Sequence, residues 1–388
     1  MARFLIYTSP ARGHLYPVVD TLVELHGRGH EVHVRTLASE VTALRDLALL
    51  AEPIATEIES IPLDTWRAAT PQEGLSQALA TFAQRARHEI PDLERAIAEI
   101  APDAVLVDIT TVGAAAVAEA SSLPWAQSVP LLQQSWLWPG APAGLVMVPF
   151  ALDPAGIEVL NGPRRQLGLS AFAHPDEVWR ATAYLYYTAP PFASAELDYP
   201  ASFRFVGPGL REPVAAAPAW LDELEAGFVL VTASSEFQRD DALIETALTA
   251  LAGTDLQVVV TTGAHAPSGF DPPSNVRLIG WLPHGPALRK ASVVVCHGGM
   301  GITQKALSAG VPACVAPFGR DQFDVAHRVA ELEAGTAVLP PDLSPESLRT
   351  AVRAAADLRA GAARVAAGFA AAGGAPAAAD RLESLLPT

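Results

Sequence analysis

The chain has 388 residues, of which 50% are hydrophobic and 18% are charged, and its formal net charge at pH 7 is -16. This length favours two domains, and the apolar content excludes wholesale disorder because a large core can be built. The negative charge disfavours nucleic acid and anionic membranes, since an acidic protein repels both. We therefore expect a protein that binds no nucleic acid and no membrane.

Cys296 and Cys314 are the two cysteines, and each lies in an apolar, strand-like run. No CxxC motif and no Cys/His spacing typical of metal ligands occurs, so we expect reduced thiols, no metal site and a cytoplasmic protein. The N-terminal apolar run is too short for a signal peptide. Residues 120–152 carry no charge, but five prolines and three glutamines exclude a continuous membrane-spanning helix. They predict a strand followed by an apolar, aromatic loop beside a pocket.

The first half of the chain alternates strand-like and helical patterns, which predicts β-α-β units and a parallel sheet. The expected elements are a strand at 3–9, a helix at 17–28, a strand at 31–36, a helix at 75–100, a strand at 103–108, a helix at 112–120 and a strand at 124–129. Residues 207–219 are rich in proline and alanine, which indicates a linker.

The same alternation starts again after the linker. The expected elements are strands at 228–232, 256–262, 275–280, 292–296 and 312–318, and helices from about 239, from about 301, near 322–333 and near 344–358. We therefore predict an α/β protein with an N-terminal domain at 1–206, a linker at 207–219 and a C-terminal domain at 220–388. Two doubly wound, Rossmann-like sheets would then face a central cleft with the carboxyl ends of their strands.

A glycine-rich turn, "CHGGMG", connects the strand at 292–296 to the next helix. Gly298, Gly299 and Gly301 allow backbone N–H groups to approach a ligand, and a helix N-terminus favours an anion such as a diphosphate. His297 and Thr303 can add side-chain donors. The spacing matches neither the P-loop nor the dinucleotide fingerprint, so glycine content alone leaves a purely structural turn equally open.

The surroundings of this turn resemble a known family. The stretch 281–329, from "WLPHGPAL" to "APFGRDQFDVAHRV", resembles the nucleotide-sugar signature of GT-B glycosyltransferases of the UDP-glycosyltransferase family, especially the bacterial branch that acts on natural products. The N-terminal "GH..P" turn and the mid-chain "FVGP" match in the same order. The resemblance thus covers the whole chain and implies the GT-B fold, with an acceptor-binding domain at 1–206 and a nucleotide-sugar-binding domain at 220–388.

The resemblance assigns roles in donor binding. Trp281 should stack on the nucleotide base, and Asp321 and Gln322 should bond hydroxyls of the donor sugar. The expected diphosphate contacts are His297, Gly298, Gly299, Met300, Gly301 and Thr303, with Ser234 and Ser235 from a second strand-to-helix turn. Helix capping is the alternative for Asp321, Gln322 and the two serines.

Lys305 stands where many relatives carry a glutamate that holds the ribose hydroxyls. Lysine cannot accept a hydrogen bond, which favours thymidine diphosphate (TDP) over uridine diphosphate (UDP) because deoxyribose lacks one hydroxyl. A side chain that donates to the ribose, approaches the phosphates or points to solvent stays open.

His14 and Asp108 are the candidate catalytic pair. His14 lies in the turn after the first strand, with Pro17 at the expected start of the helix, and Asp108 ends another apolar strand at the same edge of the sheet. An aspartate bonded to one ring nitrogen fixes the tautomer and leaves the other nitrogen to take a proton. In the resembled family this pair deprotonates the acceptor hydroxyl, and a structural histidine is the alternative.

The resemblance therefore implies an inverting transfer of a sugar, expected to be a deoxy sugar, from TDP or UDP to a hydroxyl of a hydrophobic natural product. The sugar nucleotide is a co-substrate, and we expect no tightly bound cofactor and a monomer or homodimer. The acceptor pocket is expected to include Trp66, Phe82, Trp136 and Trp138, although such aromatics also serve as core. A GT-B sugar-nucleotide epimerase and an inactive auxiliary binding protein are the alternatives, and the missing dinucleotide fingerprint disfavours an oxidoreductase.

Overall fold

The computed structural model describes residues 1–68, 70–132, 154–193, 197–212, 216–234, 241–263 and 271–387. The chain divides into two compact units, each of which is described by itself. The first unit contains 1–189, 194–211 and 372–388, and the second contains 190–193 and 212–371.

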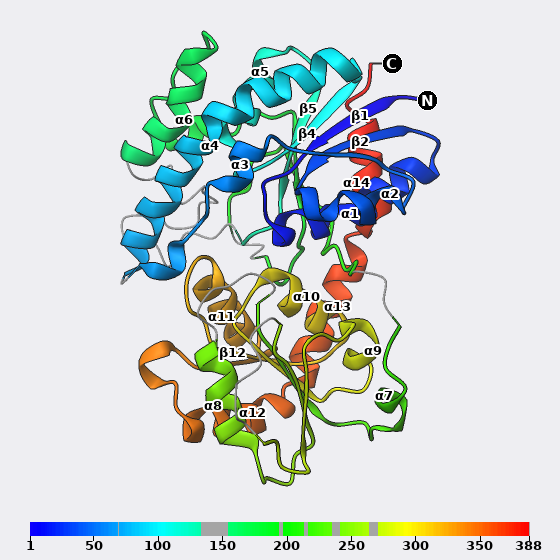
Figure 1. Cartoon of the computed structure of the whole chain (residues 1–388), viewed down its shortest axis with the longest axis vertical. Coiled ribbons are helices and arrows are strands. Elements are labelled where there is room, and N and C mark those ends of the chain that lie inside the picture. The colour runs from blue at the N-terminus through cyan, green and yellow to red at the C-terminus, as the bar shows by residue number, and fades with distance from the viewer. Residues whose placement is uncertain are drawn as a thin grey trace. The chain divides into compact units, whose positions relative to one another are not determined.

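The first unit is a parallel seven-stranded sheet with helices on both faces (Figure 1). Its strands are β1 (Arg3–Tyr7), β2 (Glu31–Thr36), β3 (Leu50–Pro53), β4 (Ala104–Asp108), β5 (Trp125–Val129), β6 (Ala183–Tyr186) and β7 (Phe203–Phe205). Its helices are α1 (Arg12–Gly27), α2 (Val41–Arg45), α3 (Thr56–Ser60), α4 (Pro71–Ile100), α5 (Val112–Ala120), α6 (Pro154–Gln166) and α14 (Gly374–Glu383). The strand order is β3-β2-β1-β4-β5-β6-β7. Central strands such as β4 are buried along their whole length, which is why they are almost continuously apolar.

The second unit is a parallel six-stranded sheet in the order β10-β9-β8-β11-β12-β13. Its strands are β8 (Val229–Thr232), β9 (Val258–Thr261), β10 (Val276–Ile279), β11 (Val293–Cys296), β12 (Ala313–Val315) and β13 (Gly335–Ala337). Its helices are α7 (Trp220–Glu223), α8 (Asp241–Leu251), α9 (His284–Leu288), α10 (Met300–Ser308), α11 (Gln322–Glu331), α12 (Pro345–Ala356) and α13 (Arg359–Ala371). The two doubly wound sheets confirm the predicted α/β class.

The first helix begins earlier than predicted. It starts at Arg12, so Pro17 lies inside α1 and not at its first position. A proline at this place loses only the one N–H bond to the Gly13 carbonyl, four residues back, and the helix tolerates that loss near its start. His14 is consequently part of the first turn of α1, where the prediction placed it in the preceding loop.

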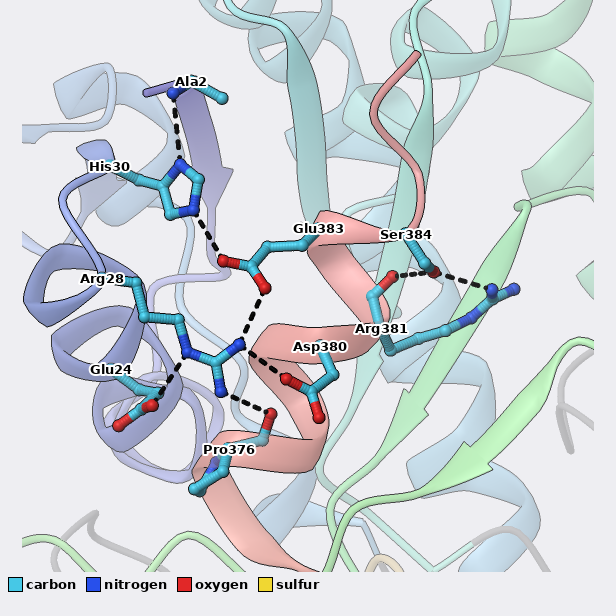
Figure 2. A network of polar contacts seen from close by, with 9 residues as sticks. All are labelled: Ala2, Glu24, Arg28, His30, Pro376, Asp380, Arg381, Glu383 and Ser384. Atoms are coloured by element: carbon cyan, nitrogen blue, oxygen red, sulfur yellow. Dashed lines mark hydrogen bonds and ion pairs between the residues drawn. The ribbon is translucent and has the colours of Figure 1, made fainter. Parts of the chain in front are cut away.

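Residues 372–388, which the sequence places in the C-terminal domain, belong to the first unit in the structure. Apolar residues of α14 share one core with α1 and β1, including Leu382 with Leu22 and Phe4. Polar contacts add to this packing (Figure 2): Arg28 donates to Asp380 (2.6 Å) and Glu383 (2.7 Å). These contacts join residues more than 350 positions apart, so no local pattern revealed them.

Candidate active site

The candidate residues gather where each sheet reverses its direction of growth. In the first sheet this point lies between β1 and β4, and in the second it lies between β8 and β11. Ligands of open α/β sheets bind at such switch points, beyond the carboxyl ends of the strands. His14 follows β1 and Asp108 ends β4, whereas Ser234 follows β8 and His297 follows β11.

The structure brings His14 and Asp108 together. Nδ1 of His14 lies 2.8 Å from Oδ2 of Asp108, although 94 residues separate them in sequence. The Asp108 side chain is fully buried, and that of His14 is 22% exposed. A buried carboxylate bonded to Nδ1 fixes the imidazole orientation and stabilises its protonated form. The pair thus has the arrangement of a general base and the residue that orients it.

The turn after β4 holds the Asp108 carboxylate in place. Its Oδ1 accepts hydrogen bonds from the Thr110 backbone N–H (2.9 Å) and the Thr110 hydroxyl. The Thr111 hydroxyl donates to the Asp108 backbone oxygen at 2.7 Å. With one carboxylate oxygen fixed by the turn, the other is directed at His14.

The glycine turn between β11 and α10 carries little side-chain bulk beside its backbone. Gly298 has φ +91°, which disfavours residues with a side chain. A Cβ at Gly299 would lie 2.4 Å from Nε2 of His297, so only glycine lets this ring lie across the turn. Helix α10 starts at Met300, whereas Gly301 has open space beside it. The His297 ring therefore lies beside the first N–H groups of α10.

Thr303 contributes differently from the prediction. Its side chain is fully buried, its hydroxyl lies 3.7 Å from Sγ of Cys296, and its N–H donates within the helix to Gly299 at 3.1 Å. Thr303 thus joins α10 to β11, and neither its N–H nor its buried hydroxyl is placed as a surface donor to a diphosphate.

Gln322 and Asp321 stand at the start of α11. Gln322 is 2% exposed, and its Oε1 accepts from the backbone N–H groups of Phe318 (2.8 Å) and Gly319 (3.1 Å). Its amide oxygen therefore shapes the loop between β12 and α11. Asp321 occupies the N-cap position without a side-chain capping bond, so capping does not explain its side chain.

Asp324 is a buried acid that the sequence motifs do not single out. It is 3% exposed, and its Oδ1 has no hydrogen-bond partner among the described residues. Burial, and then the charge of Asp321, raises the pKa of Asp324 to about 8. In the sequence, the available signal was the position of Asp324 itself, three residues after Asp321.

Lys305 does not point to solvent. Its Nζ lies 3.7 Å from Oε2 of Glu212, and its side chain is 16% exposed. Glu212 also accepts from the backbone N–H groups of His284 (2.9 Å) and Gly285 (2.8 Å). Burial, with a contribution from Lys305, lowers the pKa of His284 to about 4. A lysine thus lies beside the "WLPH" segment with Glu212 as its counter-ion.

The predicted aromatic contacts differ in exposure. Trp281 is 45% exposed, which leaves its ring accessible for stacking, whereas Phe82 is 7% exposed and lies in the core. Trp66 is partly buried and donates to Asp64 at 3.3 Å. Trp136, Trp138 and Ser235 lie outside the described residues.

Membrane-spanning helices and metal-ligand clusters can be assessed in the part of the chain that the structure describes. No helix there is both long enough and apolar enough to cross a membrane. No group of three or more histidine, cysteine, aspartate or glutamate residues there could hold a metal ion.

The chain is similar to proteins that make antibiotics. Residues 245–385 match the family model described as the C-terminal domain of erythromycin biosynthesis protein CIII-like proteins. The 4'-demethylrebeccamycin synthase of Lentzea aerocolonigenes is 30% identical, and the match covers 92% of each chain.

Solved structures show the same fold along the whole chain. The glycosyltransferase of kitacinnamycin has a TM-score of 0.80 and 26% identity, and the match covers 100% of this chain and 99% of that one. The glycosyltransferase VinC in complex with DTDP has a TM-score of 0.73 and 25% identity, with 99% of both chains covered. These similarities support a glycosyltransferase of natural-product biosynthesis. The chain therefore belongs to the GT-B glycosyltransferases of antibiotic biosynthesis.

Proposed function

We propose that this glycosyltransferase transfers a deoxy sugar from TDP to a hydroxyl of a hydrophobic natural product, with inversion at the anomeric carbon. The observation that carries the proposal is the 2.8 Å contact between His14 and Asp108 at the switch point of the first sheet. The relatives named above support the class of acceptor.

His14 acts as the general base in this proposal. Its Nδ1 is engaged by Asp108, so Nε2 takes the proton of the acceptor hydroxyl while that oxygen attacks the anomeric carbon. The bond to the diphosphate oxygen breaks, and Asp108 stabilises the imidazolium that forms. General-base catalysis of this kind contributes roughly 10²- to 10⁴-fold in rate.

The leaving diphosphate accumulates negative charge. We infer that the start of α10 and the His297 side chain stabilise this charge. The first N–H groups of a helix and its dipole favour an anion. Stabilisation aimed at developing charge is usually a large part of catalysis. We infer that the helix end takes the place of a metal ion here.

The preference for TDP rests on Lys305 and its surroundings. Lys305 cannot accept a hydrogen bond from a ribose hydroxyl, and Glu212 uses its oxygens on the backbone of His284 and Gly285. The related VinC structure contains DTDP, which agrees with this preference.

Nucleotide protection against thermal unfolding tests the donor site. A ligand at a hundredfold excess over its dissociation constant stabilises a protein by roughly 2.7 kcal/mol. We expect TDP to raise the melting temperature more than UDP does, and His297→Ala to remove the effect. Equal protection of the wild type and His297→Ala would refute the assignment of the diphosphate to this turn.

Transfer kinetics test the base. His14→Ala should reduce kcat by roughly 10²-fold or more while protection by TDP persists, because the change lies outside the nucleotide-binding turn. A variant that retains full transfer activity would show that His14 is not the base.

A further inference from the structure

Helix α4 carries a row of buried polar residues beneath the strand ends that bear the catalytic pair. Arg85, Glu89 and Asp92 are spaced along one face and are 6%, 1% and 2% exposed. Ionisable groups are rarely buried this deeply unless they bond to specific partners. Asp92 accepts from the Tyr7 hydroxyl of β1 at 2.9 Å. The partners of Glu89 lie elsewhere.

Glu89 supplies the cap that α5 lacks from its own sequence. Its Oε2 accepts from the backbone N–H groups of Gly113 (2.8 Å) and Ala114 (3.4 Å), in the first turn of α5. The residue at the N-cap position is Thr111, but its hydroxyl donates to the Asp108 carbonyl and makes no capping bond. The N–H groups that Thr111 leaves unsatisfied are thus satisfied by a side chain from α4.

The contact between the two helices is tight at this point. A Cβ on Gly113 would lie 2.6 Å from the Ala86 backbone oxygen, so α5 meets the backbone of α4 directly. The position of the first turn of α5 is therefore set by α4, by packing and by the Glu89 carboxyl together.

The same turn of α5 is continuous with the loop that holds Asp108. Thr110 donates to one carboxylate oxygen of Asp108, and the other lies 2.8 Å from Nδ1 of His14. We propose that Glu89 is a positioning residue: by anchoring the N-terminus of α5 it holds Asp108 where it meets His14. The inference rests on the proposed role of His14 for its catalytic meaning.

The raised pKa of the Glu89 carboxyl indicates that this side chain is largely uncharged at neutral pH. Burial raises the pKa of Glu89 to about 8, and Asp108 adds to this, while the N–H groups of α5 and Arg85 act in the opposite direction. Asp92 and Tyr7 also lie in this buried cluster, and burial, followed by the influence of Glu89 and Asp92, raises the pKa of Tyr7 well above its usual value. A protonated Glu89 still accepts from the N–H groups without placing a second negative charge behind Asp108.

Glu89→Gln and Glu89→Met in the full chain separate the anchor from simple burial. Glutamine keeps an acceptor oxygen, and methionine fills similar space without one. The readout is the NMR titration of the His14 ring, assigned by comparison with His14→Gln, and Asp108→Asn shows the titration without the carboxylate.

We expect Glu89→Met to move the His14 titration midpoint down by about one pH unit, toward that of Asp108→Asn, since a displaced carboxylate stabilises the imidazolium less. Glu89→Gln should leave the midpoint unchanged. Asp92→Asn, an equally buried acid on the same helix, is the control and should also leave it unchanged. If Glu89→Met does not fold, Glu89→Asp, one methylene shorter, should shift the midpoint in the same direction.

An unshifted midpoint in the folded Met or Asp variant would overturn the inference. An equal shift in Glu89→Gln would overturn it too, because the charge and not the anchor would then act. The outcome is independent of the proposed base. Full activity of His14→Ala refutes the base but leaves the titration result standing, whereas an unshifted midpoint refutes the anchor alone.

Discussion

Asp108 shows how one buried side chain depends on several others. Its carboxylate accepts from Thr110 on one oxygen and contacts His14 with the other. It is fully buried, so these contacts replace hydration that the carboxylate has lost. This arrangement makes the orientation of His14 sensitive to the identity of residue 108.

Asp108→Asn should lower kcat by roughly 10²-fold or more, because an amide cannot stabilise the imidazolium that forms when His14 takes a proton. The KM of the nucleotide sugar should change little. Steady-state transfer kinetics measure both values. Asp103→Asn, before the opposite end of β4, is the control, and an equal loss in it would point to general damage of the sheet.

Asp324 should make the free protein less stable as the pH rises. Its pKa is raised to about 8 in the folded state, so between about pH 4 and pH 8 the unfolded chain loses this proton and the folded chain keeps it. Stability then falls by up to roughly 1.4 kcal/mol per pH unit. Asp324→Asn removes this loss.

Denaturant unfolding of the wild type and Asp324→Asn at pH 5 and pH 8 checks the sign. The variant should gain stability relative to the wild type as the pH rises. A constant difference between the two proteins would show that Asp324 is ionised in the folded state across this range.

At the scale of elements, the glycine turn and α10 act together. The ring of His297 lies so close to Gly299 that an added Cβ would approach Nε2 to 2.4 Å. Gly299→Ala should therefore displace the ring and reduce protection by TDP as strongly as His297→Ala does. Thermal unfolding with and without TDP measures this.

Gly27→Ala is the matched control, because a Cβ there has no heavy atom within 4 Å. It should keep the full TDP effect. Undiminished protection of Gly299→Ala would mean that the His297 ring takes no part in binding.

At the scale of the whole molecule, the chain returns to its first unit through α14. Arg28 bonds to Asp380 and Glu383, and Nε2 of His30 lies 2.7 Å from Glu383 (Figure 2). The bonds from His30 and Arg28 lower the pKa of Glu383. A carboxyl with a lowered pKa contributes stability above its ordinary pKa and loses it as the pH falls.

Glu383→Gln should lower the melting temperature by a few degrees at pH 7, and this difference should shrink below about pH 4.5, where the wild-type carboxyl also becomes protonated. Calorimetry at several pH values measures it. Glu94→Gln, an exposed acid on α4, should change little at any pH. A pH-independent effect of Glu383→Gln would show that packing and not charge joins α14 to the unit.

The sequence by itself determined the alternation of strands and helices, the two-sheet class and the glycine turn, because apolar periodicity and glycine spacing are local properties. It also singled out His14 and Asp108. Only the tertiary structure decided that these two side chains touch, that Lys305 pairs with Glu212 and that Glu89 anchors α5. Each of these contacts joins residues from different parts of the chain, which local pattern does not bring together. His14 and Asp108 meet because β1 and β4 are neighbours in the sheet.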